Sequence, residues 1–164
     1  MLAYIWAEAS NHVIGQNGKL PWHLPDDMQF FKDQTINHQI LAGKRTYDSF
    51  GRPLPKRKNL VLTHFPQSDF PAGVKVFKTI DEFLQYAKGY PNEVIFVVGG
   101  TSVFKELLPY VDYLYRTSIN HEFNGDVRMI DIDYSQFELE QQVPGKVDKN
   151  NVYPHTFDVF KRKK

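Results

Sequence analysis

Short apolar runs alternate with amphipathic stretches along most of the chain. Residues 94–98 form a continuous apolar run, which is typical of a central strand covered on both faces. Residues 79–82 have the hydroxyl-to-glutamate spacing of a capping box and so predict the start of a helix. The pattern predicts strands at 2–9, 38–43, 59–63, 73–77, 93–98, 112–119, 136–143 and 153–161, and helices at 25–35, 44–50, 79–88 and 101–108.

This alternation predicts an α/β layered fold. The last two predicted strands follow one another without a helix, so an antiparallel pair is expected to close one edge of the sheet. No repeat or linker divides the 164 residues, a length that suits one domain with a full core. We therefore expect a single domain over 1–164, with a central mixed eight-stranded sheet and about four helices.

The charge balance argues against some classes of partner. Twenty basic and 19 acidic side chains give a net charge of +1, which does not favour broad capture of nucleic acid or of an anionic membrane. The absence of cysteine excludes disulfides, thiolate catalysis and zinc–thiolate sites. The six histidines form no close pair on a predicted helix, so no metal site is expected.

The N-terminal segment is apolar, but it has no basic region before it and meets Glu8 early, so it is interpreted as a core strand rather than a secretion signal. No apolar run approaches the roughly 20 residues that span a bilayer. The basic tail 161–164 is interpreted as a solvated strand end. We therefore expect a cytoplasmic protein without a membrane partner.

Two adjacent acids, Asp26 and Asp27, fall at the start of the first predicted helix, after Pro25. The simplest interpretation is that both favour the helix dipole. At about 100° per residue, however, Asp27 lies within an apolar stripe formed by Leu24, Met28 and Phe31, flanked by Phe30 and Ile36, whereas Asp26 points towards water. A carboxylate on a core-facing position is costly unless it is partnered, so Asp27 is the better functional candidate.

A lone buried carboxylate is suited to a flat ligand. It can accept two parallel N–H bonds from an amidine-like or 2-aminopyrimidine edge, while Met28 and Phe31 pack against the ring. Ser49 and Ser102 have no histidine partner in their sequence context, and neither lies in a nucleophile elbow. Hydrolase chemistry is therefore not supported.

Two glycine-containing strand-to-helix turns, at 43–46 and 99–102, are suited to anions because a helix N-terminus follows each. Neither has Walker or Rossmann spacing, and glycines before a helix can also serve close packing. Taken together, the turns suggest a dinucleotide. Lys44, together with Thr63 and His64, could bind an extra phosphate on the ribose. This interpretation favours NADPH over NADH as the cofactor.

Two further segments have the composition of binding loops. Residues 51–58 hold two prolines and four cations, a rigid platform from which Arg52 or Arg57 can clamp a carboxylate. Lys56 and Lys58 are interpreted as solvated. Residues 10–24 form a long connection of the kind that often serves as a lid.

The ordered motifs resemble those of the dihydrofolate reductase family, particularly the chromosomal enzymes of Gram-positive bacteria. The matching blocks cover nearly the whole chain and are Val-Ile-Gly at 13–15, Leu-Pro-Trp-His-Leu-Pro-Asp-Asp at 20–27, Gly-Lys-Arg-Thr-Tyr at 43–47, Gly-Arg-Pro-Leu-Pro-Lys-Arg-Lys-Asn at 51–59 and Val-Gly-Gly at 98–100. Each block alone is modestly specific, but the ordered set is highly specific.

The resemblance implies NADPH-dependent reduction of 7,8-dihydrofolate to tetrahydrofolate for one-carbon metabolism. Hydride would pass to pterin C6, and a water entering beside Leu20 would protonate N5. Asp27 would hold the pterin, supported by Thr117, and Asp126 would brace the lid. The implied catalytic positions are Asp27, Trp22, Leu20 and Thr117. Diaminopyrimidine and pteridine antifolates would inhibit, and a monomer is the default.

The resemblance also implies the lining of both binding sites, with residues 38–105 forming the adenosine-binding part. Arg57 would take the α-carboxylate of the glutamate tail, with Lys32 and Arg52 near the mouth. The other substrate positions are Ile5, Trp6, Ala7, Met28, Phe31, Ser49, Phe50 and Leu54. The cofactor positions are Ala7, Ile14, Gly15, Gly18, Trp22, Gly43, Lys44, Arg45, Thr46, Leu62, Thr63, His64, Val98, Gly99, Gly100, Thr101, Ser102, Val103 and Phe104.

Three positions depart from the family's usual pattern. Thr101 stands where many relatives continue the glycine run, Lys44 replaces the usual arginine, and Val127 stands where threonine is common. Two alternatives are weighed against the main interpretation: the related pyrimidine reductase of riboflavin synthesis, and a nucleotide-binding module without activity. Asp27, Trp22 and Arg57 argue against the first, and a module would need neither Asp27 nor the lid.

Overall fold

The computed structural model describes residues 1–164 and contains ten strands and four α-helices. Three short 3-10 turns lie at Gln67–Asp69, Leu108–Tyr110 and Tyr134–Gln136. The helices are α1 (Pro25–Thr35), α2 (Lys44–Ser49), α3 (Ile80–Ala87) and α4 (Thr101–Leu107). The strands are β1 (Leu2–Ala9), β2 (Val13–Gly15), β3 (Gln39–Gly43), β4 (Lys58–Leu62), β5 (Lys75–Phe77), β6 (Ile95–Gly99), β7 (Tyr113–Ile119), β8 (Val127–Arg128), β9 (Phe137–Pro144) and β10 (His155–Arg162).

Eight of the strands form one sheet in the order β5-β4-β3-β6-β1-β7-β10-β9, and β2 pairs with β8 in a second, small sheet. The larger sheet is mixed, because β3 runs parallel to β4 and β6, whereas β10 runs antiparallel to β7 and β9. The predicted α/β fold, with a mixed eight-stranded sheet and four helices, is confirmed.

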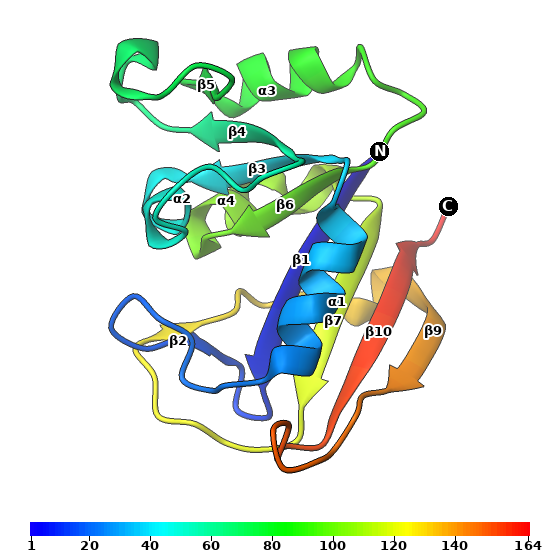
Figure 1. Ribbon diagram of the computed structural model, residues 1–164. Coiled ribbons are helices and arrows are strands. Elements are labelled where there is room, and N and C mark those ends of the chain that lie inside the picture. Colours follow the sequence, from blue (N-terminus) through cyan, green and yellow to red (C-terminus); the bar gives the residue numbers. More distant parts are fainter. The chain divides into compact units, whose positions relative to one another are not determined.

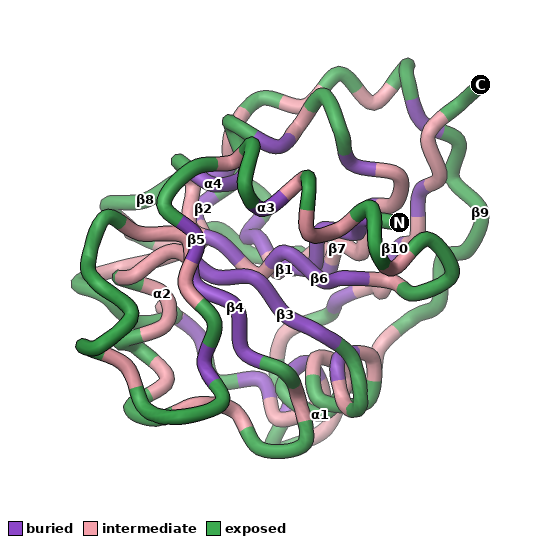
Figure 2. The backbone as a smooth tube through the Cα atoms, turned by 90° about the horizontal axis from the view of Figure 1, so that it is seen from above, coloured by how far each residue is buried: buried purple, intermediate pink, exposed green.

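The chain divides into two compact units, of which the first comprises Met1–Ala3 and Thr35–Val111. Its strands β5, β4, β3 and β6 are parallel, and parallel strands need crossover connections, to which α2 and α3 contribute. Buried Ile40, Leu41, Leu60, Val61 and Val97 make β3, β4 and β6 apolar on both faces. Much of these three strands is purple in Figure 2. The unit includes the whole of residues 38–105, whose assignment to adenosine binding stays a prediction, as does the single domain over 1–164.

The second unit comprises Tyr4–Gln34 and Asp112–Lys164. Here α1 lies along the strands β7 and β10 (Figure 1), and the ring of Phe30 stacks on Phe157 with centroids 4.2 Å apart. The antiparallel ladders of β10 with β7 and β9 confirm the predicted C-terminal edge.

The small sheet of β2 and β8 lies outside the predicted strands, and β2 falls within the loop predicted at 10–24. With three and two residues, these strands are too short to show a period-two pattern in the sequence. Gly125 explains the close approach of the two segments, because a Cβ at this position would overlap the side chain of Val13 and the carbonyl oxygen of Gly15. The absence of a side chain at Gly125 is therefore a packing requirement of this small sheet.

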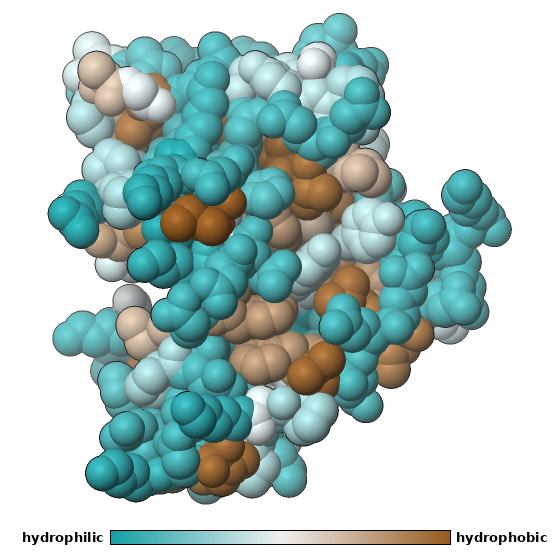
Figure 3. Space-filling view, turned by 45° about the vertical axis from the view of Figure 1, so that its right-hand side comes forward, coloured by the Kyte–Doolittle hydropathy of each residue, from teal (hydrophilic) through white to brown (hydrophobic).

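The ends of the other elements agree with prediction to within about two residues. The hydroxyl of Thr79 accepts a bond from the Glu82 N–H at 3.1 Å, so the predicted capping box does begin α3. The strand β6 starts at Ile95, one residue after the apolar run begins. None of the helices has the length and apolar character needed to cross a bilayer. Hydrophilic side chains cover most of the face in Figure 3, with hydrophobic groups between them.

Candidate active site

Asp27 is a buried carboxylate in the first turn of α1, with 9% of its surface exposed. Pro25 begins the helix, where its missing N–H needs no partner, and Asp27 follows two residues later. Thr117, buried near the middle of β7, donates its hydroxyl hydrogen to Asp27 Oδ1 at 2.6 Å. The structure thus brings together the two residues that the sequence analysis paired.

Burial raises the pKa of the Asp27 carboxyl above its ordinary value. The Thr117 hydrogen bond and the positive charge of His155 act in the opposite direction, and the negative charge of Asp26 adds a smaller upward contribution. Burial is the largest of these effects, so Asp27 keeps its proton to a higher pH than a solvated aspartate does.

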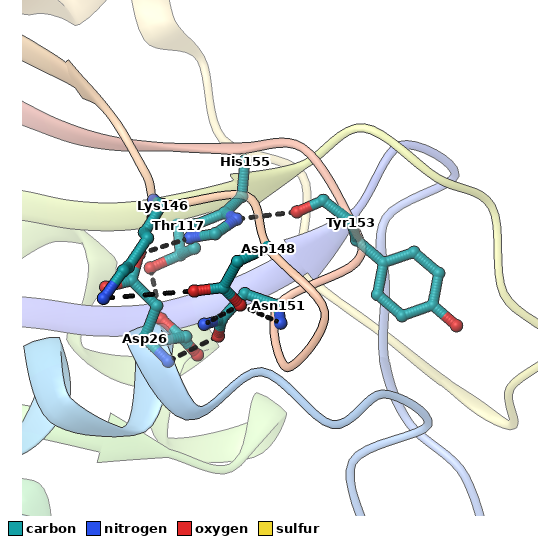
Figure 4. Close-up of polar contacts among 8 residues, drawn as sticks. Asp26, Thr117, Lys146, Asp148, Asn151, Tyr153 and His155 are labelled. Carbon is teal, nitrogen blue, oxygen red and sulfur yellow. Dashed lines mark hydrogen bonds and ion pairs between the residues drawn. The ribbon is translucent and has the colours of Figure 1, made fainter.

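Asp26 is not a solvated helix-end acid, and that prediction was wrong. Its Oδ2 lies 2.7 Å from His155 Nε2 and accepts the Lys146 backbone N–H at 2.9 Å, and its own N–H donates to Asn151 Oδ1 at 2.8 Å (Figure 4). Helical phase alone missed these partners because they come from residues 145–155, more than 100 positions along the chain.

The predicted apolar stripe on α1 was also partly wrong. Leu24 is buried, but Met28 is 59% exposed and Phe31 is half-buried. Phe30, which was placed on the flank, packs on Phe157 instead. The contacts of Asp27 with β7 and of Phe30 with β10 determine which face of α1 is buried. That face is therefore rotated away from Met28 relative to the prediction.

Trp22 lies buried within a cluster that includes Val13, Leu24 and Ile119, and its ring centroid is 5.4 Å from that of Phe123. Its indole N–H has no hydrogen-bond partner, although a buried donor without one is costly. The indole is therefore a donor that remains available for a ligand. Leu20, two residues earlier, is 54% exposed.

The loop 10–24, predicted to be a lid, is fastened at its tip. Asp126 Oδ2 accepts a bond from the Asn17 N–H at 3.2 Å, and the Asp126 N–H donates to the Gly15 carbonyl at 3.1 Å. Gly18 has a positive φ of 76° and is exposed, and Ile14 is half-buried. The structure thus contains the contact through which Asp126 was predicted to brace this loop.

Three consecutive residues of β1 were assigned to the ligand sites. Ile5 and Trp6 are buried and Ala7 is half-buried. The Trp6 indole donates to Glu8 Oε1 at 2.8 Å, and Glu8 Oε2 lies 2.5 Å from His12 Nδ1. Glu8, which the sequence analysis used only to argue against a signal peptide, holds the Trp6 ring.

Arg57 is oriented by two bonds, from Nη1 to Thr35 Oγ1 at 3.2 Å and from Nε to the Pro55 carbonyl at 3.0 Å. Burial lowers the pKa of its guanidinium from the ordinary value. The buried Asn59 braces the preceding loop through the N–H and carbonyl of Leu54 and the carbonyl of Arg57, all at 3.0 Å. The rigid platform predicted around Arg57 therefore rests on an asparagine as well as on prolines.

The remaining residues assigned to the substrate's mouth are less enclosed. Lys32 and Arg52 are exposed, and Phe50 and Leu54 are half-buried. The Ser49 hydroxyl, which is exposed, donates to the Thr46 carbonyl within α2 at 2.6 Å.

The glycine turns after β3 and β6 begin α2 and α4. Gly43 and Gly100 are the N-cap residues, and neither helix start has a side-chain cap, so backbone N–H groups there remain for a ligand. A Cβ on Gly43 would come within 3.2 Å of Val103 Cγ2, so this glycine also serves close packing, the alternative considered above. The Gly99–Gly100 peptide bond is cis, and Gly99 has a φ of 120°.

Lys44 Nζ bonds to both carboxylate oxygens of Asp48, at 2.8 and 2.6 Å, and lies 5.1 Å from the centroid of the Phe65 ring. The other residues of this unit that were predicted to hold the cofactor differ in exposure. Val103 and Phe104 are buried; Thr46, Leu62, Thr63, Val98 and Thr101 are half-buried; Arg45, His64 and Ser102 are exposed.

Comparison with known proteins agrees with this geometry. The dihydrofolate reductase family model matches residues 1–162. The chain belongs to the dihydrofolate reductase family. It is 40% identical to the dihydrofolate reductase of Bacillus subtilis (strain 168) over 163 residues, covering 99% of this chain and 95% of the relative. It is also 40% identical to that of Enterococcus faecium, covering 99% and 97%.

A solved structure described as dihydrofolate reductase from Enterococcus faecalis complexed with NADP(H) and RAB-propyl has a TM-score of 0.93 and 45% identity to the chain. The match covers 100% of this chain and 97% of the chain in that structure. The predicted family and its Gram-positive character, together with the predicted enzyme class, are confirmed.

Sequence reasoning missed the residues that orient other side chains of the candidate site. His155 and Asn151 bind Asp26, Thr35 binds Arg57, and Glu8 binds Trp6. Only Asn59 carried a signal, as a polar residue at the head of the apolar run of β4.

Proposed function

We propose that this chain reduces 7,8-dihydrofolate to 5,6,7,8-tetrahydrofolate with NADPH as the reductant. The observation that carries the proposal is the buried Asp27, held by Thr117 at 2.6 Å within a chain of the dihydrofolate reductase family. The relative from Enterococcus faecalis, described as complexed with NADP(H), supports the choice of cofactor.

The pterin ring would be anchored by Asp27. An ionised carboxylate only accepts hydrogen bonds, and the 2-amino group and N3 of a pterin present two parallel N–H donors. Thr117 fixes the orientation of the carboxylate. The unpartnered indole N–H of Trp22 would bond to substrate or to a bound water. The half-buried Phe31, with Ile5 and Ala7, would provide apolar contact, and the exposed Met28 would contribute only on ligand binding.

The glutamate tail would be held by Arg57. Thr35 and the Pro55 carbonyl use Nη1 and Nε, so the guanidinium keeps other N–H groups for a carboxylate. The pre-set orientation lowers the entropic cost of forming a two-bond pair. Lys32 and Arg52 are exposed cations that would add charge near the mouth.

The residues around the two glycine turns fit a dinucleotide. The uncapped starts of α2 and α4 offer backbone donors for its phosphates, and Lys44, Arg45 and His64 offer positive or protonatable groups. Lys44 with Thr63 and His64 would hold the phosphate on the ribose that distinguishes NADPH from NADH. When bound, NADPH supplies the hydride.

The reduction adds a hydride at pterin C6 and a proton at N5, so that the C6–N5 double bond becomes single. We infer that a water molecule delivers the proton to N5 and that it enters beside Leu20, which is exposed to solvent. The negative charge of Asp27 favours proton uptake by the ring it binds. The lid 10–24, fastened by Asp126, would exclude other water.

The direct test is the loss of NADPH absorbance when dihydrofolate is added to purified protein. We expect oxidation that requires both reactants and is blocked by a diaminopyrimidine antifolate. No change with dihydrofolate would overturn the proposal. A parallel assay with a phosphorylated ribosyl pyrimidine tests the related reductase activity, and we expect no turnover there.

We further propose that the chain acts as a monomer in the cytoplasm and supplies tetrahydrofolate for one-carbon metabolism. Sedimentation of the purified protein tests the first part, since a monomer has a mass of 19.1 kDa. A stable dimer at micromolar concentration would contradict it.

A further inference from the structure

His155 is an imidazole with no exposed side-chain surface at the start of β10. Its Nδ1 lies 2.8 Å from the Tyr153 carbonyl oxygen, and its Nε2 lies 2.7 Å from Asp26 Oδ2 (Figure 4). A carbonyl oxygen can only accept a hydrogen bond, so Nδ1 carries a proton. The charge of the ring then depends on whether the proton between Nε2 and Asp26 belongs to the histidine or to the acid.

Two features of the surroundings of Asp26 are suited to a negative charge. The same Oδ2 accepts the Lys146 backbone N–H at 2.9 Å, and the residue lies in the first turn of α1, where the helix dipole stabilises negative charge. An ionised carboxylate is purely an acceptor, so Nε2 also carries a proton. These contacts fit an imidazolium at His155, paired with Asp26.

The ring is tightly enclosed. A Cβ on Gly145 would overlap the imidazole, and the Gly145 N–H donates to the His155 carbonyl at 2.8 Å. The Phe157 ring meets it edge-on at 5.3 Å, and Ile119 is its partner on β7. This packing excludes water from the ring, so the interaction between His155 and Asp26 is weakly screened.

The charged groups near the ring come from two elements. The helix α1 contributes Asp26 and Asp27, and the loop after β9 contributes Lys146 and Asp148, whose Nζ and Oδ2 are 3.9 Å apart near the surface. By strand alternation, Tyr115, Thr117 and Ile119 share one face of β7. None of them is charged at neutral pH, since burial raises the pKa of the Tyr115 phenol above its ordinary value. His155 is thus the buried cation of this cluster.

We propose that His155 is a positioning residue whose positive charge, held by Asp26, keeps the neighbouring buried Asp27 ionised. Without His155, the negative charge of Asp26, one residue away, would oppose the ionisation of Asp27. The imidazolium cancels that effect, and its Coulombic contribution favours the Asp27 carboxylate, as noted above. The catalytic consequence rests on the proposed function, but the charge relation does not.

The first experiment observes the ring directly. In ¹⁵N NMR of the protein without ligands at pH 7, we expect both ring nitrogens of His155 to be protonated. A neutral tautomer at this pH would overturn the proposal, and this outcome needs no variant to fold.

The second experiment follows the Asp27 carboxyl by ¹³C NMR as pH is varied, with the signal assigned by Asp27→Asn. His155→Gln retains a donor but removes the charge, so the Asp27 midpoint should move to higher pH. The double variant Asp26→Asn/His155→Gln removes both charges and should bring the midpoint back towards wild type.

Asn151→Ala is the matched control, because it loosens the same loop from Asp26 without altering a charge. Its Asp27 midpoint should match wild type. An unmoved midpoint in His155→Gln, or an equal shift in Asn151→Ala, would show that His155 acts only in packing.

Activity then separates this proposal from the proposed function. For dihydrofolate reduction, His155→Gln should shift the acidic limb of the kcat/KM profile to higher pH and leave the maximum of the profile within about twofold of wild type. An Asp27 shift by NMR in a protein with no reductase activity at any pH would overturn the proposed function and leave the charge relation standing.

Discussion

The start of α1 and the glycine turns before α2 and α4 handle charge in different ways. At the start of α1, Asp27 is buried and Asp26 is half-buried, and each is bound by another side chain, Thr117 and His155 respectively. At the turns, the helix starts have no side-chain cap, and Arg45 and His64 are exposed. Under the proposed function, the first region would bind one ring through fixed partners, whereas the second would give an extended anion many modest contacts. Single substitutions should therefore have large effects in the first region and small ones in the second.

The largest expected effect follows from Asp27→Asn. Loss of the negative charge removes both the acceptor for the pterin edge and the electrostatic support for N5 protonation. Dihydrofolate reduction at pH 7 should fall by about 10²–10⁴-fold, measured as initial rates of NADPH oxidation. The Kd for NADPH, from fluorescence titration, should stay near wild type. Wild-type turnover would refute the assigned role.

Replacement of Arg57 should affect binding rather than turnover. Arg57→Leu removes charge-assisted bonds to the tail carboxylate, each worth about 1.5–3 kcal/mol, so KM for dihydrofolate should rise by roughly 10–100-fold with little change in kcat. Steady-state kinetics measure both. Lys58→Gln, a nearby cation interpreted as solvated, is the control and should leave KM unchanged. An equal effect of both variants would indicate only a diffuse charge effect.

The acids at the start of α1 show how far the sequence could take the site. Helical phase separated Asp27 from Asp26 correctly, because both residues obey the geometry of one helix. It failed for the environment of Asp26, since His155 and Asn151 lie far along the chain and local spacing carries no information about their approach. Met28 failed for a related reason, because packing of Phe30 on Phe157 sets the buried face of α1.

The same limit applies to the fold. The long elements were predictable from period and capping, as the bond between Thr79 and Glu82 shows. The pairing of β2 with β8 was not, because it depends on contact between two loops that Gly125 permits. The rigid loop around Arg57 was predictable from its prolines, but the bond from Arg57 to Thr35 depends on a residue 22 positions away.

At the glycine turns, Lys44→Gln should weaken the preference for NADPH over NADH by about twofold to tenfold. The effect is modest because Lys44 also pairs with Asp48, and partly exposed ion pairs contribute only about 0–1 kcal/mol. The ratio of kcat/KM for the two cofactors measures the preference. An equal loss with both cofactors would place Lys44 elsewhere than at the ribose phosphate.

The smallest expected effect is on stability and depends on pH. Because burial raises the pKa of Asp27 in the folded state, its contribution to stability is fully present below the unfolded pKa of about 3.9 and is lost as pH rises through the folded value. Asn at position 27 has no such titration. Asp27→Asn should therefore gain stability relative to wild type between pH 4 and pH 8, even though it loses activity. A difference of 1 kcal/mol corresponds to roughly 2–4 °C in Tm for a domain of this size, which thermal unfolding at the two pH values resolves. If the gap between the variants stayed constant with pH, burial would not control the ionisation of Asp27, and the contrast between the two regions would lose its physical basis.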